Sequence, residues 1–205
     1  MIGVEQQGGL WVLTLNRPEK ANALTKAMLE ELDAAVARAA LSGATALILT
    51  GVGKVFSAGA DLEAARAGLA TDPVWERLST RLAGFGGLTI AALNGSLAGG
   101  SMGMALACDL RLAVPGANFF YPVMRLGFLP QPSDPARLAA LIGPSRAKMI
   151  LMAGAKIGAQ EALAWGLIDR VCAADELMGQ ARTLAADALA AKAGHAEAIK
   201  AMLRG

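Results

Sequence analysis

Two glycine-rich turns, each preceded by an apolar run, constrain this chain more than any other feature. The first turn spans residues 56–61 and follows the run 46–50, and the second spans residues 94–101 and follows the run 89–93. Small side chains in such turns leave backbone N–H groups accessible to a ligand. Two N–H donors that converge on one oxygen would form an oxyanion hole, which stabilises a thioester enolate or a tetrahedral intermediate.

The composition predicts one folded domain. The 205 residues are long enough for a substantial core, and a hydrophobic fraction of 55% against 18% charged residues argues against disorder. Alanine supplies much of this fraction, which favours some burial between subunits. The formal net charge is only +2, and no basic tract alternates with aromatic residues, so we expect no nucleic-acid partner.

The cysteines and the N-terminal segment favour a reducing cytoplasm. Cys108 and Cys172 are far apart and form no CxxC pair, and the chain has a single histidine, so we expect no metal site. The first residues lack the pattern of a signal peptide. Residues 82–108 carry no charge and are long enough to span a bilayer. Several glycines interrupt them, however, so a strand, a turn and a helix are favoured over a membrane segment.

Hydrophobic periodicity predicts alternating strands and helices. A hairpin is expected from residues 2–6 and 10–15, and Thr25 is a candidate N-cap for a helix that ends near residue 41. The other expected strands are 46–50, 89–93, 110–113, 118–121 and 168–172. The other expected helices are 61–69, 73–82, 101–107, 135–141, 145–152, 159–165, 175–191 and 193–203. This alternation predicts a single α/β domain.

Nucleotide-binding motifs have little support. Gly51 and Gly53 follow a strand, but Phe56 stands where a dinucleotide fingerprint needs its third glycine. The chain also contains no P-loop, because no Gly-Lys-Ser/Thr occurs at the required spacing.

Four segments together resemble the enoyl-CoA hydratase/isomerase (crotonase) superfamily. They are residues 16–24, 48–62, 91–109 and 159–168, and they occur in the family's order over about residues 10–200. The resemblance implies an α/β fold that is a spiral of ββα units, with a core over residues 1–175 and a short helical segment over residues 176–205. Family members usually continue with further helices, so we expect a shortened C-terminal region. An acyl-CoA thioester is the implied substrate, with no separate cofactor, and the implied assembly is a homotrimer or a dimer of trimers.

The resemblance also assigns roles to individual residues. The backbone N–H groups of Ala60 and Gly100 would form the oxyanion hole, with Gly59 and Gly99 in the same two turns. Ala58 would lie beside the CoA adenine.

Three further candidate residues have simpler alternatives. Lys20 is a candidate for a CoA phosphate or, alternatively, a solvated lysine in a turn. Asp61 would contribute to substrate binding or cap the following helix. Tyr121 is a candidate proton donor, with core packing as its alternative.

The match breaks at the residues that handle water in the family's hydratases. The two positions that carry glutamate there correspond to Gly103 and Val123. A positioned acid or base typically contributes about 10²–10⁴-fold in rate, so efficient hydration is not expected. Double-bond isomerisation or another enolate reaction is favoured, and a non-catalytic acyl-CoA-binding protein is the alternative.

Two further positions bear on the acid and base. Gln131 occupies the position at which some isomerases and dehalogenases of the family place a carboxylate, and Asp134 is a candidate acid or base nearby. The alternative for Asp134 is an N-cap before Pro135.

A third hypothesis is a serine hydrolase, because Ser101 resembles the serine turn of Clp-type proteases, which share a related fold. The only histidine, His195, is on the predicted terminal helix, so packing or capping by Ser101 is favoured.

Overall fold

The computed structural model describes residues 1–203, which contain a six-stranded sheet with the order β1-β2-β3-β5-β7-β10. Its strands are β1 (Ile2–Gln7), β2 (Leu10–Leu15), β3 (Ala46–Gly51), β5 (Leu88–Leu93), β7 (Leu110–Ala113) and β10 (Arg170–Val171). The predicted hairpin of β1 and β2 is antiparallel, and the other neighbours are parallel. The last strand is shorter than expected.

A second, smaller sheet has the order β4-β6-β8-β9. It consists of β4 (Val55–Ser57), β6 (Ser96–Ala98), β8 (Asn118–Phe120) and β9 (Ile157–Gly158), and the first three are mutually parallel. β4, β6 and β8 each directly follow a strand of the larger sheet and each precede a helix, which confirms the predicted α/β fold of ββα units. The strands β4, β6 and β9 were not predicted, because β4 and β6 overlap the two stretches expected as glycine-rich turns and β9 has only two residues.

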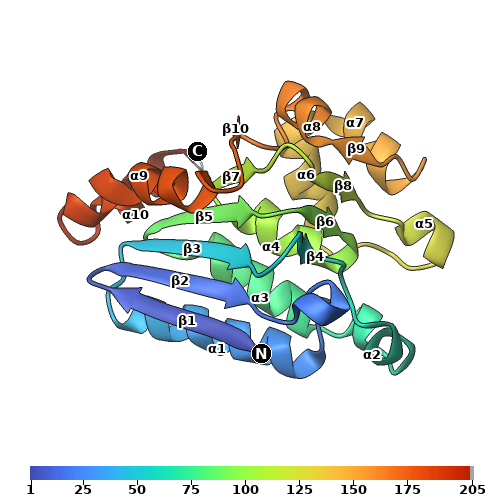
Figure 1. Ribbon diagram of the computed structural model, residues 1–205, viewed down its shortest axis with the longest axis horizontal. Coiled ribbons are helices and arrows are strands. Elements are labelled where there is room, and N and C mark those ends of the chain that lie inside the picture. Colours follow the sequence, from blue (N-terminus) through green and yellow to red (C-terminus); the bar gives the residue numbers. More distant parts are fainter. Residues whose placement is uncertain (204–205) are drawn as a thin grey trace.

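Helices cover the larger sheet on both sides (Figure 1). α1 (Lys26–Leu41) and α3 (Val74–Ala83) lie along one face, and α9 (Leu177–Ala190) packs against β3, β5 and β7, followed by α10 (His195–Leu203). The main chain of Met28 donates a hydrogen bond to Thr25 Oγ1, which confirms this residue as the N-cap of α1. Burial on both faces explains why β3 and β5 are continuous apolar runs rather than alternating ones.

The remaining helices are short. They are α2 (Leu62–Arg66), α4 (Met102–Ala107), α5 (Val123–Leu126), α6 (Asp134–Ile142), α7 (Pro144–Leu151) and α8 (Ala159–Trp165), with 3₁₀ turns η1 (Pro18–Lys20), η2 (Leu69–Thr71) and η3 (Gly99–Ser101). The expected single helix over residues 61–69 is wrong. α2 ends at Arg66 because Gly68 adopts a φ of +101°, which a continuous helix does not accommodate, and η2 follows.

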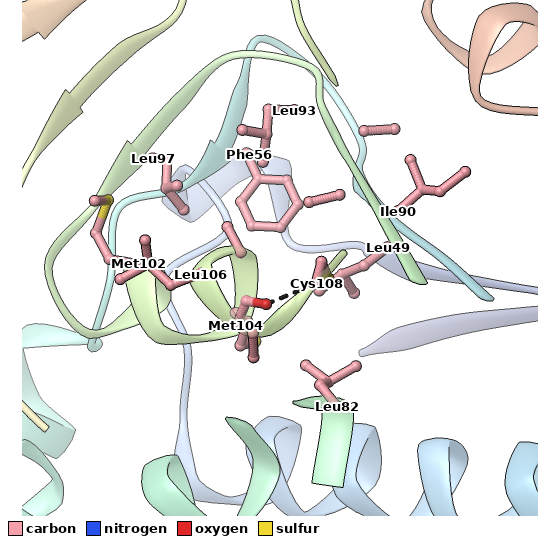
Figure 2. Packing of buried hydrophobic residues seen from close by; sticks show 14 of the residues in the cluster. Leu49, Phe56, Leu82, Ile90, Leu93, Leu97, Met102, Met104, Leu106 and Cys108 are labelled. Carbon is pink, nitrogen blue, oxygen red and sulfur yellow. Dashed lines mark hydrogen bonds between the residues drawn. The ribbon is translucent and has the colours of Figure 1, made fainter. Parts of the chain in front are cut away.

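The core joins the two sheets to α4 (Figure 2). The side chains of Phe56, Leu93 and Leu97 gather with those of Met104 and Leu106 from this helix. Cys108 belongs to the same cluster, and its thiol donates a hydrogen bond to the carbonyl oxygen of Met104. Burial raises the pKa of Cys108 to about 12, so this thiol stays protonated and packs as a small apolar group.

Among residues 1–203, no helix combines the length and the apolar character that a bilayer crossing requires. The uncharged stretch 82–108 is instead divided between the end of α3, the strands β5 and β6, and α4, as the sequence indicates.

Candidate functional site

The site lies where three parallel strands end at the same edge of the smaller sheet. Because β4, β6 and β8 run in parallel, the residues that follow each of them emerge side by side. These residues line one apolar cavity of about 170 Å³. They include Ala58 and Ala60 after β4, Gly99 and Gly100 after β6, and Tyr121, Pro122 and Val123 after β8.

Helices and a loop complete the cavity. Leu62 and Ala65 come from α2, and Val123 and Leu126 come from α5, which lies at the same end of the molecule (Figure 1). The other lining residues are Ala70, Trp75, Ala98, Phe120, Phe128, Leu129 and Gln131. Among the described lining residues, the side chains with an oxygen or nitrogen atom are those of Trp75, Tyr121 and Gln131, and the lining holds no Asp, Glu, His or Lys.

The two glycine turns are in direct backbone contact. Gly59 has a φ of +90°, and a Cβ atom there would lie 2.8 Å from the carbonyl oxygen of Ala98 and 3.4 Å from the Cα of Gly99. Gly99 itself has a φ of +58°. Glycine is therefore required at position 59 both for its backbone conformation and for the close approach of the second turn.

The N–H group of Ala60 points away from the N-terminal segment that carries Leu24. The carbonyl oxygen of Gly59 accepts a hydrogen bond from the N–H of Leu24 at 2.8 Å, and the N–H of Asp61 donates to Leu24 at 2.8 Å. A trans peptide places its C=O and N–H on opposite sides. The N–H of Ala60 therefore faces the other side of this segment, and Ala60 lines the cavity.

The same argument orients the N–H of Gly100. The N–H of Met102 donates to the carbonyl oxygen of Gly99 within η3, so this carbonyl points along the helical turn. The N–H of Gly100 belongs to the same peptide and points the opposite way, out of the start of the turn. The ring of Trp75 packs against Gly100, where a Cβ atom would meet three ring carbons at 3.4 Å.

Tyr121, one of the lining residues, forms a buried pair of polar side chains with Asp134 of α6. The hydroxyl of Tyr121 donates to Asp134 Oδ2 at 3.0 Å, and the N–H of Gln131 donates to that hydroxyl at 3.4 Å. Asp134 is 1% exposed, and within the described residues its Oδ1 has no hydrogen-bond partner. Burial raises the pKa of Asp134 to about 7 and also raises the pKa of Tyr121.

Asp134 does not cap its helix, so the N-cap interpretation is wrong. Ser133 holds the N-cap position, and its N–H and hydroxyl both donate to Glu76 of α3. Asp134 is the first residue of α6, and its carboxylate turns inward toward α4. A Cβ atom at Gly103 of that helix would lie 2.7 Å from Asp134 Oδ1 and 3.1 Å from Oδ2. The carboxylate therefore occupies the space that any side chain at position 103 would need.

Comparison with known protein families and solved structures gives one result. The sequence profile described as enoyl-CoA hydratase/isomerase matches residues 5–205. This chain belongs to the enoyl-CoA hydratase/isomerase family. A short-chain-enoyl-CoA hydratase of Clostridium acetobutylicum is 35% identical over 193 residues, which cover 89% of this chain and 72% of the relative. A carnitinyl-CoA dehydratase of Escherichia coli is 37% identical over 191 residues, which cover 88% and 71%.

Solved structures agree with this assignment. The crystal structure of an enoyl-CoA hydratase from Bacillus anthracis superposes with a TM-score of 0.90 at 31% identity, and the match covers 100% of this chain and 82% of that one. The resemblance inferred from the four sequence segments is therefore confirmed at the level of family and fold.

The N-terminal segment of this family member braces the first glycine turn. Asn22 Nδ2 donates to the carbonyl oxygens of Val52 and Val55, and the N–H of Ala58 donates to Ala21 at 3.0 Å. Lys20, one residue before Ala21, is exposed in η1 and does not line the cavity. The segment thus holds this lysine next to the turn that contains Ala58.

Asp61 serves the turn rather than the cavity. Its Oδ1 accepts hydrogen bonds from the N–H groups of Glu63 and Ala64, which confirms the predicted cap of α2. Its Oδ2 pairs with Arg17 at 2.8 Å, and this hydrogen bond holds the pKa of Asp61 below its ordinary value. Asp61 is not among the lining residues, and a direct contact with substrate stays a prediction.

Ser101 has no geometry for nucleophilic catalysis. It is fully buried, its hydroxyl donates to Ala98 at 2.6 Å, and it does not line the cavity. His195 belongs to α10 and lines a separate groove between α9 and α10. The packing interpretation of Ser101 is favoured, although its side chain makes no capping hydrogen bond.

Sequence reasoning missed most of the apolar lining. Trp75 follows the helical spacing of Val74, Leu78 and Leu82, which indicates a core residue and gives no sign of the cavity behind it. The exposed residues Leu126 and Leu129 lie near α5, a short helix that was not predicted. Nothing in the local sequence shows that these residues face the glycine turns.

Proposed function

We propose that this chain binds acyl-CoA thioesters and shifts the double bond of an enoyl-CoA through an enolate, instead of adding water efficiently. The single observation that carries this proposal is the cavity itself. The two glycine turns are in backbone contact, and Ala60 and Gly100 both line the apolar cavity. The carbonyl oxygens of Gly59 and Gly99 accept hydrogen bonds on one side of their peptide groups, and the N–H groups of Ala60 and Gly100 point to the other side.

The two N–H groups would bind the thioester carbonyl oxygen. Removal of a proton from the α-carbon of a 3-enoyl-CoA moves negative charge onto this oxygen and gives a dienolate. Return of a proton at the γ-carbon yields the 2-enoyl-CoA with no net change in composition. Fixed donors aimed at the oxygen stabilise the dienolate more than the substrate, which accelerates the reaction. The apolar walls strengthen this effect because they exclude water.

The lining argues against hydration. Addition of water needs an acid or base that positions the water at the β-carbon. Of the two positions that carry glutamate in the family's hydratases, Gly103 is buried in α4 and Val123 contributes an apolar surface to the cavity. The relatives named above include a hydratase and a dehydratase, so the family supports acyl-CoA chemistry in general without fixing the reaction of this chain.

The proposal extends to the coenzyme and the assembly. Lys20 would bind a CoA phosphate and Ala58 would lie beside the adenine, since the segment of Ala21 is hydrogen-bonded to the turn of Ala58. We also expect a homotrimer or a dimer of trimers, as the family resemblance implies. Multi-angle light scattering after size-exclusion chromatography tests this expectation, and a monomeric mass would contradict it.

Two measurements on the wild-type chain test the function. Isotope-edited infrared spectroscopy of a thioester labelled with carbon-13 at the carbonyl should show a lower stretching frequency on binding. Incubation with 3-hexenoyl-CoA should produce the conjugated 2-enoyl-CoA, whereas crotonyl-CoA should be hydrated far more slowly. Efficient hydration of crotonyl-CoA would contradict the proposal. Binding with a shifted carbonyl but no turnover of any enoyl-CoA would instead identify a non-catalytic acyl-CoA-binding protein.

A further inference from the structure

We propose that Tyr121 is the catalytic residue that exchanges protons with the bound acyl group. Asp134, whose carboxylate occupies the space that Gly103 leaves open, takes up the hydroxyl proton of Tyr121. This inference rests on the proposed function, because it supplies the proton transfer that an enolate reaction needs. It assigns the acid and base of the site to Tyr121, which follows β8, and Asp134 of α6, in place of the two absent glutamates.

The position of Tyr121 carries the first part of the argument. Its backbone follows β8, and Tyr121 is among the residues that line the same cavity as Ala60 and Gly100 while remaining only 3% exposed. Gln131 also lines the cavity, but its amide cannot act as a base, and its Nε2 donates to Ala70 at 3.1 Å. The indole N–H of Trp75 donates to Leu69 at 2.8 Å. The hydroxyl of Tyr121 is therefore the proton-exchanging group of the lining.

The hydrogen bonds of Tyr121 give the transfer a direction. The hydroxyl donates to Asp134 Oδ2, so its proton already points at a carboxylate, and its oxygen accepts from the N–H of Gln131. In the proposed step, the bond between the α-carbon and its hydrogen breaks, and the Tyr121 oxygen gains that proton. The original hydroxyl proton moves to Asp134 Oδ2. The electron pair stays on the substrate as the dienolate, and the reverse transfer delivers a proton to the γ-carbon.

Gly103 explains how the carboxylate fits. Asp134 comes from the first turn of α6 and Gly103 from α4, and the two helices pack together. The contact of 2.7 Å between Oδ1 and a Cβ atom at position 103 means that even alanine would displace the carboxylate. Gly103 thus stands where the family's hydratases carry a glutamate, and its lack of a side chain leaves room for the Asp134 carboxylate.

The surroundings of Asp134 suit a group that both takes and returns a proton. Three titratable or charged side chains act on it: Tyr121 from β8, Glu76 from α3 and Arg137 from its own helix. Burial dominates over these and raises its pKa to about 7, so both protonation states are accessible near neutral pH. The unpartnered Oδ1 shows that the carboxylate is not consumed by a structural network.

The experiment measures exchange of the α-protons of butyryl-CoA in deuterium oxide by mass spectrometry, across a range of pH. Wild-type exchange should rise with pH through a transition near 7. Asp134→Asn and Tyr121→Phe should each lower exchange by about 10²–10⁴-fold and remove this transition. The double variant should be no slower than the slower single variant, because the two groups act as one unit.

Two controls separate catalysis from folding. Asp33→Asn makes the same substitution at a buried carboxylate of α1 that pairs with Arg77 and Arg81 of α3, and it should exchange like the wild type. Gly103→Ala displaces the same carboxylate by adding a methyl group on α4, and it should lower exchange at least tenfold. When it is combined with Asp134→Asn, exchange should be no slower than in Asp134→Asn alone. Each variant should keep the lowered carbonyl frequency of bound thioester.

The outcomes distinguish this inference from the proposed function. Exchange at the wild-type rate with an unchanged pH profile in Asp134→Asn or Tyr121→Phe would overturn the inference, and so would a carbonyl shift without any exchange in the wild type. An unshifted carbonyl in the wild type would overturn the proposed function itself.

Discussion

The site has two walls that are built from different parts of the chain. The turn wall, made by residues 58–60 and 98–100, presents main-chain N–H groups, and its side chains are hydrogen or methyl. The helix wall consists of Tyr121, which lines the cavity, of Asp134, which is hydrogen-bonded to Tyr121, and of Gly103, which lies against Asp134; the last two do not line the cavity themselves. One wall therefore depends on backbone conformation, and the other depends on side-chain volume and burial.

This difference predicts how each wall tolerates substitution. The turn wall is determined by parallel strand ends and by positive φ at Gly59 and Gly99, so its sequence tolerates little change. On the helix wall the proposed acid–base carboxylate comes from α6, and Gly103 leaves room for it.

A large effect is expected for Gly59→Ala on the turn wall. The methyl group would meet the carbonyl oxygen of Ala98 at 2.8 Å, and alanine would also have to adopt a φ of +90°. Both effects separate the turns, so enolate formation should fall by about 10²–10³-fold, as for loss of one oxyanion donor. Rates of α-proton exchange give the measurement.

Gly68→Ala is the matched control for that substitution. Gly68 also has a positive φ, +101°, but a Cβ atom there has no heavy atom within 4 Å among the described residues. This variant should share the conformational strain and keep the exchange rate. Equal losses in both variants would mean that strain, and not contact between the turns, controls the site.

On the helix wall, Asp134→Asn should change how stability depends on pH. The folded-state pKa of about 7 lies above the ordinary value of 3.8, so the folded chain retains a proton that the unfolded chain releases. The free energy of unfolding of the wild type should therefore fall between about pH 4 and pH 7 and level off above, by at most about 4 kcal/mol. The variant should lack this decline, and urea titrations at several pH values would show it. Parallel curves for both proteins would refute the assignment.

Replacement of Gly103 by a larger residue tests whether the Asp134 carboxylate needs the space beside this glycine. Gly103→Glu should lower the free energy of unfolding by about 1–3 kcal/mol, because its side chain collides with the Asp134 carboxylate. Addition of Asp134→Ala should recover much of this loss. A double-mutant cycle measured by chemical denaturation gives the coupling, and purely additive effects would contradict a direct contact.

The smallest effect is expected at the exposed rim. Leu129 lines the cavity mouth and is 87% exposed, so Leu129→Ser should change stability by no more than about 0.5 kcal/mol. It should weaken binding of hexanoyl-CoA by about 1 kcal/mol relative to acetyl-CoA, since a longer acyl group reaches the rim. Isothermal titration calorimetry with both thioesters provides the comparison, and an equal change for both would place the acyl chain elsewhere.

The sequence predicts the turn wall better than the helix wall for a physical reason. The runs before the turns are buried parallel strands, and the carboxyl ends of neighbouring parallel strands meet at one edge, so local patterns suffice to bring Gly59 and Gly99 together. The contact of Gly103 with Asp134 depends instead on how α4 packs on α6, which no local period encodes. For the same reason the capping rule misassigned Asp134, whose burial decides its role.

The carbonyl frequency of a bound thioester tests the central claim most directly. Isotope-edited infrared spectra of butyryl-CoA, labelled with carbon-13 at the carbonyl, should show a lower stretching frequency on the wild-type chain than in water. The frequency should return toward the solution value on Gly59→Ala and stay lowered on Asp134→Asn. A carbonyl that binds the wild-type chain with its solution frequency would contradict the account, because no pair of main-chain donors would then be holding the oxygen.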